Sequence, residues 1–257
     1  IENSLTGQKI YFSDLENKYK KSKNFSKIWS KLYSNRYRSY HKFLNKSYTI
    51  VGHSIHLQNN FLIIKDKKGI YYKSKVSLNL EGNFILPSYL YLYGDLKDAN
   101  KLIGQNIWLN YVYDSKVFFT YSLDNFRRFS IVKVIEVINF SNDSLHTPIW
   151  LKVINKQGSE AYLRYSKTKN NTGFEDHYFT DQPLSKKWSK SMIELILKGG
   201  VKIGMNEDQL RRSIGNPDII NNTSSRYGLS EQWLYKNNNS SNAFYQFEYG
   251  KLVYVDN

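Results

Sequence analysis

The most constraining stretch of this sequence is a short helix with both of its ends marked, between Asn206 and Pro217. Asn206 can cap the helix, and the side chain of Gln209 can reach back to the Asn206 backbone, which together make a capping box. Gly215 can take the left-handed conformation that ends a helix, and Pro217 cannot continue one. The sequence therefore predicts a helix from Glu207 to Ile214.

The segments on either side of this helix complete a small module. An apolar stripe predicts an earlier helix from about Lys186 to Lys198, which Ser185 caps and Gly199 ends. After the second helix, three runs favour strands and are separated by Asn-rich or glycine-containing turns: Glu231–Tyr235, Ala243–Tyr249 and Leu252–Val255. We therefore predict two helices followed by a three-stranded antiparallel sheet over residues 184–257.

The order of these marker residues resembles that of a known family. The positions are Gly204-Met205, Gly215-x-Pro217, Gln232-Trp233-x-Tyr235 and Phe247-x-x-Gly250-x-Leu252-Val253. They resemble the SmpA/OmlA (BamE-like) outer-membrane lipoproteins, with Asn206 where that family often has the equivalent cap Thr. The resemblance covers about the last quarter of the chain and implies a protein-binding or assembly role at the cell envelope, without catalysis. Secreted β-lactamase inhibitor proteins look similar in fold, so the role of a secreted inhibitor stays open.

Trp233 and Tyr235 are candidate partner-binding residues of this module because they are aromatic and lie two residues apart on a predicted strand. A large aromatic residue on a strand can equally fill the core. We expect Trp233 to pack inside under that second interpretation.

The N-terminal segment, residues 1–45, carries most of the positive charge. The chain has a net charge of +15, and residues 1–46 hold 11 Lys and Arg against 3 Asp and Glu. Aromatic residues at spacings near three and four predict a basic helix from Asp14 to about Leu44, docked by its aromatic face. Its lysines could instead contact an anionic membrane surface, and these candidates are Lys20, Lys21, Lys23, Lys27 and Lys31. Nucleic acid is not expected as a partner, because no RNA-binding or zinc-finger motif accompanies the lysines.

The middle region, residues 46–183, alternates apolar and polar residues and predicts a β-rich domain. The stretch around Gly52 is echoed around Gly104, which is consistent with two or three tandem small barrels of SH3 type. Period two places Tyr89, Tyr91 and Tyr93 on one strand face, where they could contact a protein or a glycan. The alternative is a tyrosine-rich sheet face covered by the N-terminal helix. Together, the three regions predict an α+β protein.

Candidate chemistry is sparse. The chain has no Cys, which excludes thiol nucleophiles and disulfides, and it has no phosphate-binding or dinucleotide fingerprint. His53 and His56 would point to opposite faces of a strand. We therefore predict no catalytic residue, no metal site and no cofactor. A pocket that gathers His146, Glu175, Asp176 and His177 would instead indicate a hydrolase or a carbohydrate-active protein.

These patterns together predict a non-catalytic binding or assembly protein at the periplasmic face of a Gram-negative outer membrane, such as that of the Bacteroidetes. Its expected partners are another envelope protein and an anionic membrane surface. No apolar run approaches the roughly 20 residues that span a bilayer. The first residue is Ile1, so we expect a mature chain with a possible lipid anchor upstream.

Overall fold

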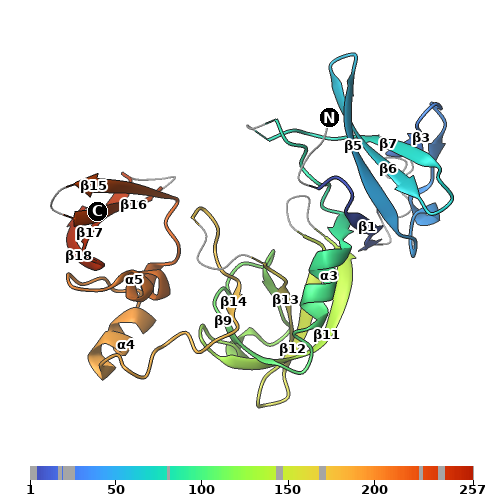
Figure 1. Ribbon diagram of the computed structural model, residues 1–257. Coiled ribbons are helices and arrows are strands. Elements are labelled where there is room, and N and C mark those ends of the chain that lie inside the picture. Colours follow the sequence, from blue (N-terminus) through green and yellow to red (C-terminus); the bar gives the residue numbers. More distant parts are fainter. Residues whose placement is uncertain are drawn as a thin grey trace. The chain divides into compact units, whose positions relative to one another are not determined.

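The computed structural model shows a chain that is mostly β, with 41% strand and 14% helix (Figure 1). It describes residues 5–16, 19, 27–79, 82–142, 147–167, 172–225, 228–236 and 241–256. The chain forms two compact units. The first holds most of the chain up to Tyr165, and the second holds the remainder together with Ile107–Tyr113 and Phe126–Val132.

The first sheet belongs to the first unit and has the strand order β4-β3-β7-β6-β5-β1-β8, with antiparallel neighbours. Its strands are β1 (Lys9–Phe12), β3 (Trp29–Lys31), β4 (Tyr37–Arg38), β5 (Tyr48–His56), β6 (Asn59–Asp66), β7 (Tyr71–Lys75) and β8 (Leu90–Leu92). The sheet curls around an aromatic core. The ring of Phe12 lies at its centre, 4.9 Å from Phe43 and 5.5 Å from Trp29 between ring centroids.

The predicted N-terminal helix from Asp14 to Leu44 is wrong. Among its described residues, this segment contributes β2 (Asp14–Leu15), β3, β4 and the short 3-10 helix η1 (Tyr40–Lys42), and Tyr19 is its one α-helical residue. Residues 17–18 and 20–26 lie outside the described part of the chain. The spacing of three and four between aromatic residues does not reflect a helix here. The chain reverses direction in a hairpin, in which Trp29 pairs with Arg38. Aromatic residues, Ser and Asn have low helix preference, and burial of these rings against Phe12 decided the conformation.

The second sheet has the order β10-β13-β12-β11-β9-β14, and β2 pairs with β11 in parallel. Its strands are β9 (Asn106–Leu109), β10 (Phe118–Phe119), β11 (Ile131–Ser141), β12 (Ile149–Ile154), β13 (Glu160–Arg164) and β14 (Tyr178–Phe179), and a 3-10 turn, η2, spans Leu123–Asn125. Both large sheets are curled and antiparallel apart from β2. Gly52 lies inside β5 at a bulge, whereas Gly104 lies in the turn before β9, so the two echoed stretches do not occupy equivalent positions.

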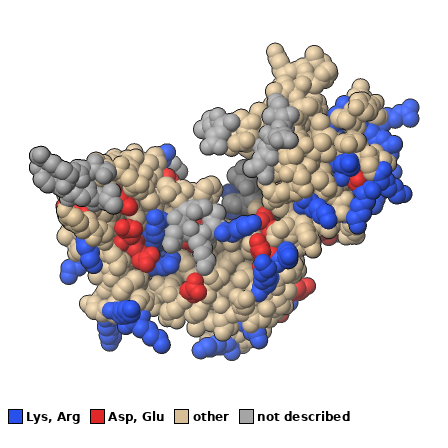
Figure 2. All heavy atoms as spheres, viewed as in Figure 1, with Lys and Arg blue, Asp and Glu red and all other residues tan. Residues whose placement is uncertain are grey.

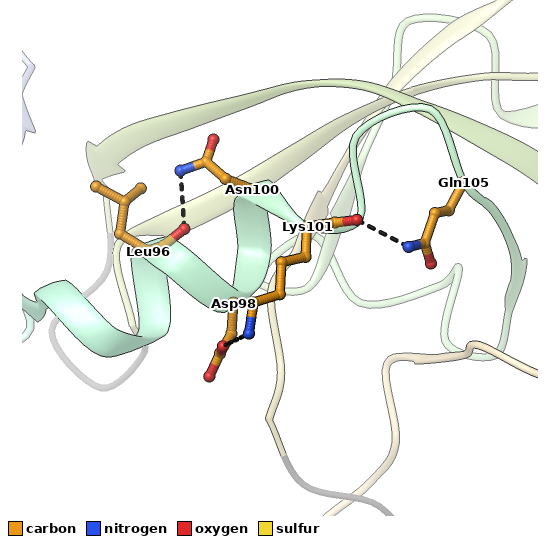
Figure 3. Close-up of polar contacts among 5 residues, drawn as sticks. All are labelled: Leu96, Asp98, Asn100, Lys101 and Gln105. Carbon is orange, nitrogen blue, oxygen red and sulfur yellow. Dashed lines mark hydrogen bonds and ion pairs between the residues drawn. The ribbon is translucent and has the colours of Figure 1, made fainter.

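Helix α3 (Tyr93–Asn100) belongs to the first unit and lies between β8 and β9 in the chain. Side chains secure its C-terminal end, as Figure 3 shows. The Asn100 amide donates to the Leu96 carbonyl oxygen, and the Gln105 amide donates to the Lys101 carbonyl oxygen, each over 2.8 Å. The Lys101 ammonium and the Asp98 carboxylate form an ion pair of 2.7 Å at the surface. This pair adds little stability because both groups are solvated.

The C-terminal part of the second unit contains α4 (Lys190–Leu197), α5 (Glu207–Ile214) and a four-stranded meander, β15 (Ile219–Ser225), β16 (Gly228–Tyr235), β17 (Ala243–Glu248) and β18 (Lys251–Asp256). Helix α5 has the predicted bounds and the predicted capping box between Asn206 and Gln209. Helix α4 begins later than predicted, because Ser189 rather than Ser185 accepts the capping bond from the Met192 amide.

The predicted α+β class is wrong. The described residues between Asp14 and Leu44 form strands and turns apart from Tyr19 and the 3-10 helix η1, and the C-terminal sheet has four strands rather than three. The missed strand, β15, is rich in Asn, Thr and Ser, residues that favour turns in isolation. Pairing along the whole of β16 supplies the hydrogen bonds that these residues do not encode locally. Residues 1–45 also do not stand apart, since β1, β3 and β4 belong to the same sheet as β5–β8.

Candidate anionic-surface binding face

Positive charge is concentrated in the part of the chain that builds the first sheet. Residues 1–79 contain 16 Lys and Arg against 4 Asp and Glu, a net charge of +12 out of +15 for the whole chain. Figure 2 shows lysine and arginine gathered over this sheet, with few acidic side chains among them. Such an excess attracts anionic partners over a range of about 8 Å at physiological salt.

Strand register arranges the lysines on one face of the sheet. Leu62, Ile64 and Tyr72 are buried, so the alternate residues of β6 and β7 point outward. Pairing then places Lys75 opposite Phe61, Lys73 opposite Ile63, and Tyr71 opposite Lys65. We call this outward side the basic face, which comprises Phe61, Lys65, Tyr71, Lys73 and Lys75. Rings and ammonium groups alternate on it.

Cation–π contacts hold these lysines near the rings. The Lys73 ammonium lies 5.7 Å from the centroid of Phe61, and the Lys65 ammonium lies 5.6 Å from that of Tyr71. Such contacts at exposed positions contribute about 0.5–1 kcal/mol each. They orient the positive charges outward without neutralising them.

Part of the basic face opens into a hollow of about 510 Å³. Its lining residues are Lys27, Ile28, Ser30, Asn35, Tyr37, His56, Leu57, Asn59, Phe61, Lys73, Ser74 and Lys75. Three lysines contribute to this lining, and no Asp or Glu does. Ammonium, amide and hydroxyl groups are suitable donors to a phosphate, so the hollow has the chemistry of an anion-binding site.

The hairpin between β5 and β6 carries exposed aliphatic residues at the edge of this hollow. Ile55 is 59% exposed and Leu57 is 80% exposed. Leu57 and Gln58 form the two-residue turn, with φ values of +47° and +60°. Positive φ at both positions is typical of a type I′ turn, which favours Asn-Gly and disfavours Leu. We call Ile55 and Leu57 the apolar tip. Neither its exposure nor its backbone conformation is explained by packing.

Only some of the predicted anion-contact lysines can be placed. Lys27 lines the hollow, and Lys31 is an exposed residue at the end of β3. Lys20, Lys21 and Lys23 lie outside the described residues. Lys65, Lys73 and Lys75 were not predicted as contact residues, although their strands alternate visibly. Alternation shows that they share a face, but strand register was needed to place that face beside Lys27.

The predicted tyrosine platform is not formed. Tyr91 is buried and stacks on Tyr11 at 5.7 Å, and Tyr89 turns toward the aromatic core, 6.1 Å from Phe12. Burial raises the pKa of both Tyr89 and Tyr91 to about 12. Tyr93 is 45% exposed but begins helix α3 rather than extending the strand. The three rings therefore do not present a common surface.

The predicted contact pair of the C-terminal module lies largely inside the second unit. Trp233 is fully buried, 4.7 Å from Phe247 between ring centroids, and the Arg211 guanidinium lies 4.3 Å from its ring. The Tyr235 hydroxyl donates to the Gly215 carbonyl oxygen over 2.9 Å, and burial raises its pKa. Trp233 is therefore a core residue and offers no surface to a partner.

Of the titratable residues that would have indicated a hydrolase, Asp176 belongs to a buried hydrogen-bond network, whereas the Glu175 side chain is exposed. Asp176 is buried, its Oδ2 accepts from the Asn216 amide over 3.3 Å, and its carbonyl oxygen accepts from the Asn110 amide over 2.6 Å. Partial desolvation of its carboxylate raises the pKa of Glu175, and the Arg128 guanidinium partly opposes that rise. The two bonds of Asp176 attach the loop before β14 to Asn110, which follows β9, and to Asn216, which follows helix α5. His146 lies outside the described residues.

The two strand histidines do lie on opposite faces. His53 is buried opposite Leu62, whereas His56 lines the hollow. In the described ranges, no three His, Asp or Glu side chains lie together in a way that could hold a metal ion. None of the described helices has the length and apolar character needed to span a membrane.

No protein-family model, curated protein or solved structure matches this chain. The site must therefore be interpreted from its own geometry and charge.

Proposed function

We propose that this protein is a non-catalytic binding protein that attaches to an anionic membrane surface through its basic face. The observation that carries the proposal is the position of Leu57. This leucine is 80% exposed, has a disfavoured backbone conformation and lines the same hollow as Lys27, Lys73 and Lys75. Lysines that meet lipid phosphates beside an aliphatic residue that enters the acyl boundary are typical of peripheral membrane binding.

The expected strength of this attachment is modest. Each lysine close to an anionic leaflet contributes about 1 kcal/mol, and burying one leucine side chain contributes about 2 kcal/mol. The exposed tyrosines Tyr33 (96%) and Tyr37 (52%) flank the basic face on the β3–β4 side and suit the headgroup region. The sum corresponds to reversible binding that weakens as salt increases.

The proposal also includes the envelope location expected from the sequence, with the C-terminal module binding another envelope protein. The order α4, α5 and a strand meander supports this part, together with the marker residues between Gly204 and Val253. Because Trp233 is buried, we assign the contact to the outer strand β18. Val253 and Tyr254 on that strand are 40% and 59% exposed. An edge strand with exposed apolar residues can add a strand from a partner.

Vesicle co-sedimentation tests the membrane proposal directly. We expect the chain to sediment with vesicles that contain about 30% phosphatidylglycerol and to stay in solution with pure phosphatidylcholine, and binding should fall between about 50 and 300 mM NaCl. The double variant Lys73→Glu/Lys75→Glu should lose binding. Lys186→Glu/Lys187→Glu changes the net charge equally at exposed positions outside the first sheet, and it should retain most of the binding.

Two results would overturn the proposal. One is equal loss of binding in both double variants, which would indicate attraction by net charge alone. The other is tight binding of single-stranded oligothymidine in the absence of vesicle binding, because rings interleaved with lysines can also hold stacked bases.

A further inference from the structure

A second hollow lies in the first unit, on the outer side of the second sheet, and the membrane proposal does not use it. Its volume is about 360 Å³, and it is lined by Glu16, Phe119, Tyr121, Ile138, Phe140, Asn142, Trp150 and Tyr162. Five of these eight side chains are aromatic. We call it the aromatic hollow.

Strand register explains why these residues meet. Phe119 on β10 pairs with Tyr162 on β13, and Ile138 on β11 pairs with Trp150 on β12, so four neighbouring strands supply the lining. Parallel pairing of β2 with the end of β11 brings Glu16, the residue after β2, to the same place. Five of the lining residues therefore lie on strands, whereas Glu16, Tyr121 and Asn142 lie just after the ends of β2, β10 and β11.

Several of the rings are open to solvent. Tyr121 is 91% exposed and Phe119 is 43% exposed. They contact each other edge to face, with ring centroids 5.1 Å apart, and Phe119 lies 6.4 Å from Tyr162. Exposed aromatic clusters of this kind mark binding surfaces, because they offer a large contact area at low entropic cost.

The charges beside the hollow are balanced. The Arg164 guanidinium lies 4.0 Å from the Trp150 ring and donates to the Asn142 side-chain oxygen over 3.0 Å. Glu16 contributes a carboxylate to the lining. The Arg164 guanidinium would repel a cationic ligand, and the Glu16 carboxylate would repel an anionic one. The arrangement therefore selects a neutral ligand that has both an apolar face and hydrogen-bonding groups.

From this geometry we propose that the aromatic hollow binds a neutral oligosaccharide. The C–H faces of a pyranose ring pack on Tyr121, Phe119 and Tyr162, and its hydroxyl groups bond to the Glu16 carboxylate and the Asn142 amide. Hydrolysis is not part of the proposal. Most glycosidases act with a pair of carboxyl groups, and among the described residues that line this hollow Glu16 is the one carboxylate. The site therefore holds a sugar chain without cleaving it.

The test uses intact protein and a panel of neutral hexasaccharides (cello-, xylo-, malto- and chitohexaose), with isothermal titration calorimetry and the quenching of tryptophan fluorescence as readouts. We expect at least one to bind, and Tyr121→Ala to weaken that binding about tenfold, as truncation of a contact aromatic residue does. Tyr113→Ala is the matched control, since Tyr113 is 83% exposed and does not line this hollow. It should leave saccharide binding unchanged. Both residues are exposed, so both variants should fold.

Three outcomes would overturn the inference. The first is that no hexasaccharide binds at concentrations up to about 10 mM, since most specific complexes have a lower dissociation constant. The second is saccharide binding that Tyr121→Ala does not weaken. The third is Tyr121-dependent binding of a decaproline peptide with no saccharide binding. The last would show that the rings accept a polyproline protein segment. Vesicle binding by Lys73 and Lys75 is measured separately, so either proposal can fail without the other.

Discussion

The carboxylate of Glu175 occupies the space that a side chain at position 215 would need. A Cβ atom on Gly215 would lie 2.5 Å from Oε1 and 2.8 Å from Oε2 of Glu175. Gly215 ends helix α5 with φ of +91° and ψ of −171°, a region that only glycine enters readily. One glycine thus allows the helix to end and the Glu175 carboxylate to approach the backbone.

We therefore expect Gly215→Ala to destabilise the protein by about 2 kcal/mol, chiefly from backbone strain and to a smaller extent from displacement of the carboxylate. Gly204→Ala is the control, because Gly204 also has a φ of +90° but its added Cβ would meet nothing within 4 Å. Urea unfolding of both variants measures the difference. In the double variant Gly215→Ala/Glu175→Ala, part of the loss should be recovered. Purely additive effects would show that the carboxylate and position 215 are not coupled.

The pH dependence of the free energy of unfolding should show the raised pKa of Glu175. Partial desolvation raises its pKa, so the folded state holds the proton more tightly than the unfolded state does. Its stabilising contribution is complete below the ordinary Glu pKa of about 4.3 and is lost as pH rises through the raised folded value. The free energy of unfolding of Glu175→Gln, relative to the wild type, should therefore increase between about pH 4 and pH 7. Glu248→Gln controls for the loss of one exposed negative charge, and a decrease for Glu175→Gln would contradict the assignment.

The hairpin tip should separate stability from binding. Changing Leu57 to Asn and Gln58 to Gly provides the residues that a type I′ turn favours, and should stabilise the protein by about 1 kcal/mol. The same change removes the exposed leucine, so binding to anionic vesicles should weaken. Thermal unfolding and co-sedimentation measure the two effects. A variant that is more stable and binds equally well would remove Leu57 from the membrane proposal.

Arg164 should be irreplaceable by lysine. Its guanidinium is almost fully buried and donates to the carbonyl oxygens of Lys116 and Thr147, each over 2.6 Å, and to Asn142. An ammonium group cannot reach these three acceptors in the same fork geometry. Arg164→Lys should cost about 2–4 kcal/mol in the free energy of unfolding, through unsatisfied buried acceptors. Arg127→Lys, at an exposed arginine, should cost less than about 0.5 kcal/mol, as surface changes do.

The local signals of the C-terminal module were strong enough to predict parts of it. The capping box at Asn206 and the glycine at 215 each act within one helix, so the bounds of α5 followed from the sequence. The interpretation of Trp233 as a core residue was also confirmed. Strand β15 could not be predicted, because its polar residues become a strand through pairing with β16.

The candidate site was only partly predictable for a related reason. Lys27 could be selected from its charge and sequence neighbours, but Lys73 and Lys75 come from a strand that the chain reaches more than forty residues later. Their convergence depends on the pairing of β3 with β7 and of β6 with β7. The aromatic hollow likewise required Glu16 to meet residues around 119–162 through the parallel pairing of β2 with β11.

By itself, the sequence determined where charge accumulates, where α5 begins and ends, and that the middle region alternates as strands do, because these properties depend on neighbours within a few residues. The tertiary structure decided that the aromatic N-terminal segment forms strands and not a helix, since burial of Trp29 and Phe43 around Phe12 outweighs a local helical spacing. It also decided which lysines and which rings share a surface, because strand register is set by contacts between segments distant in the chain.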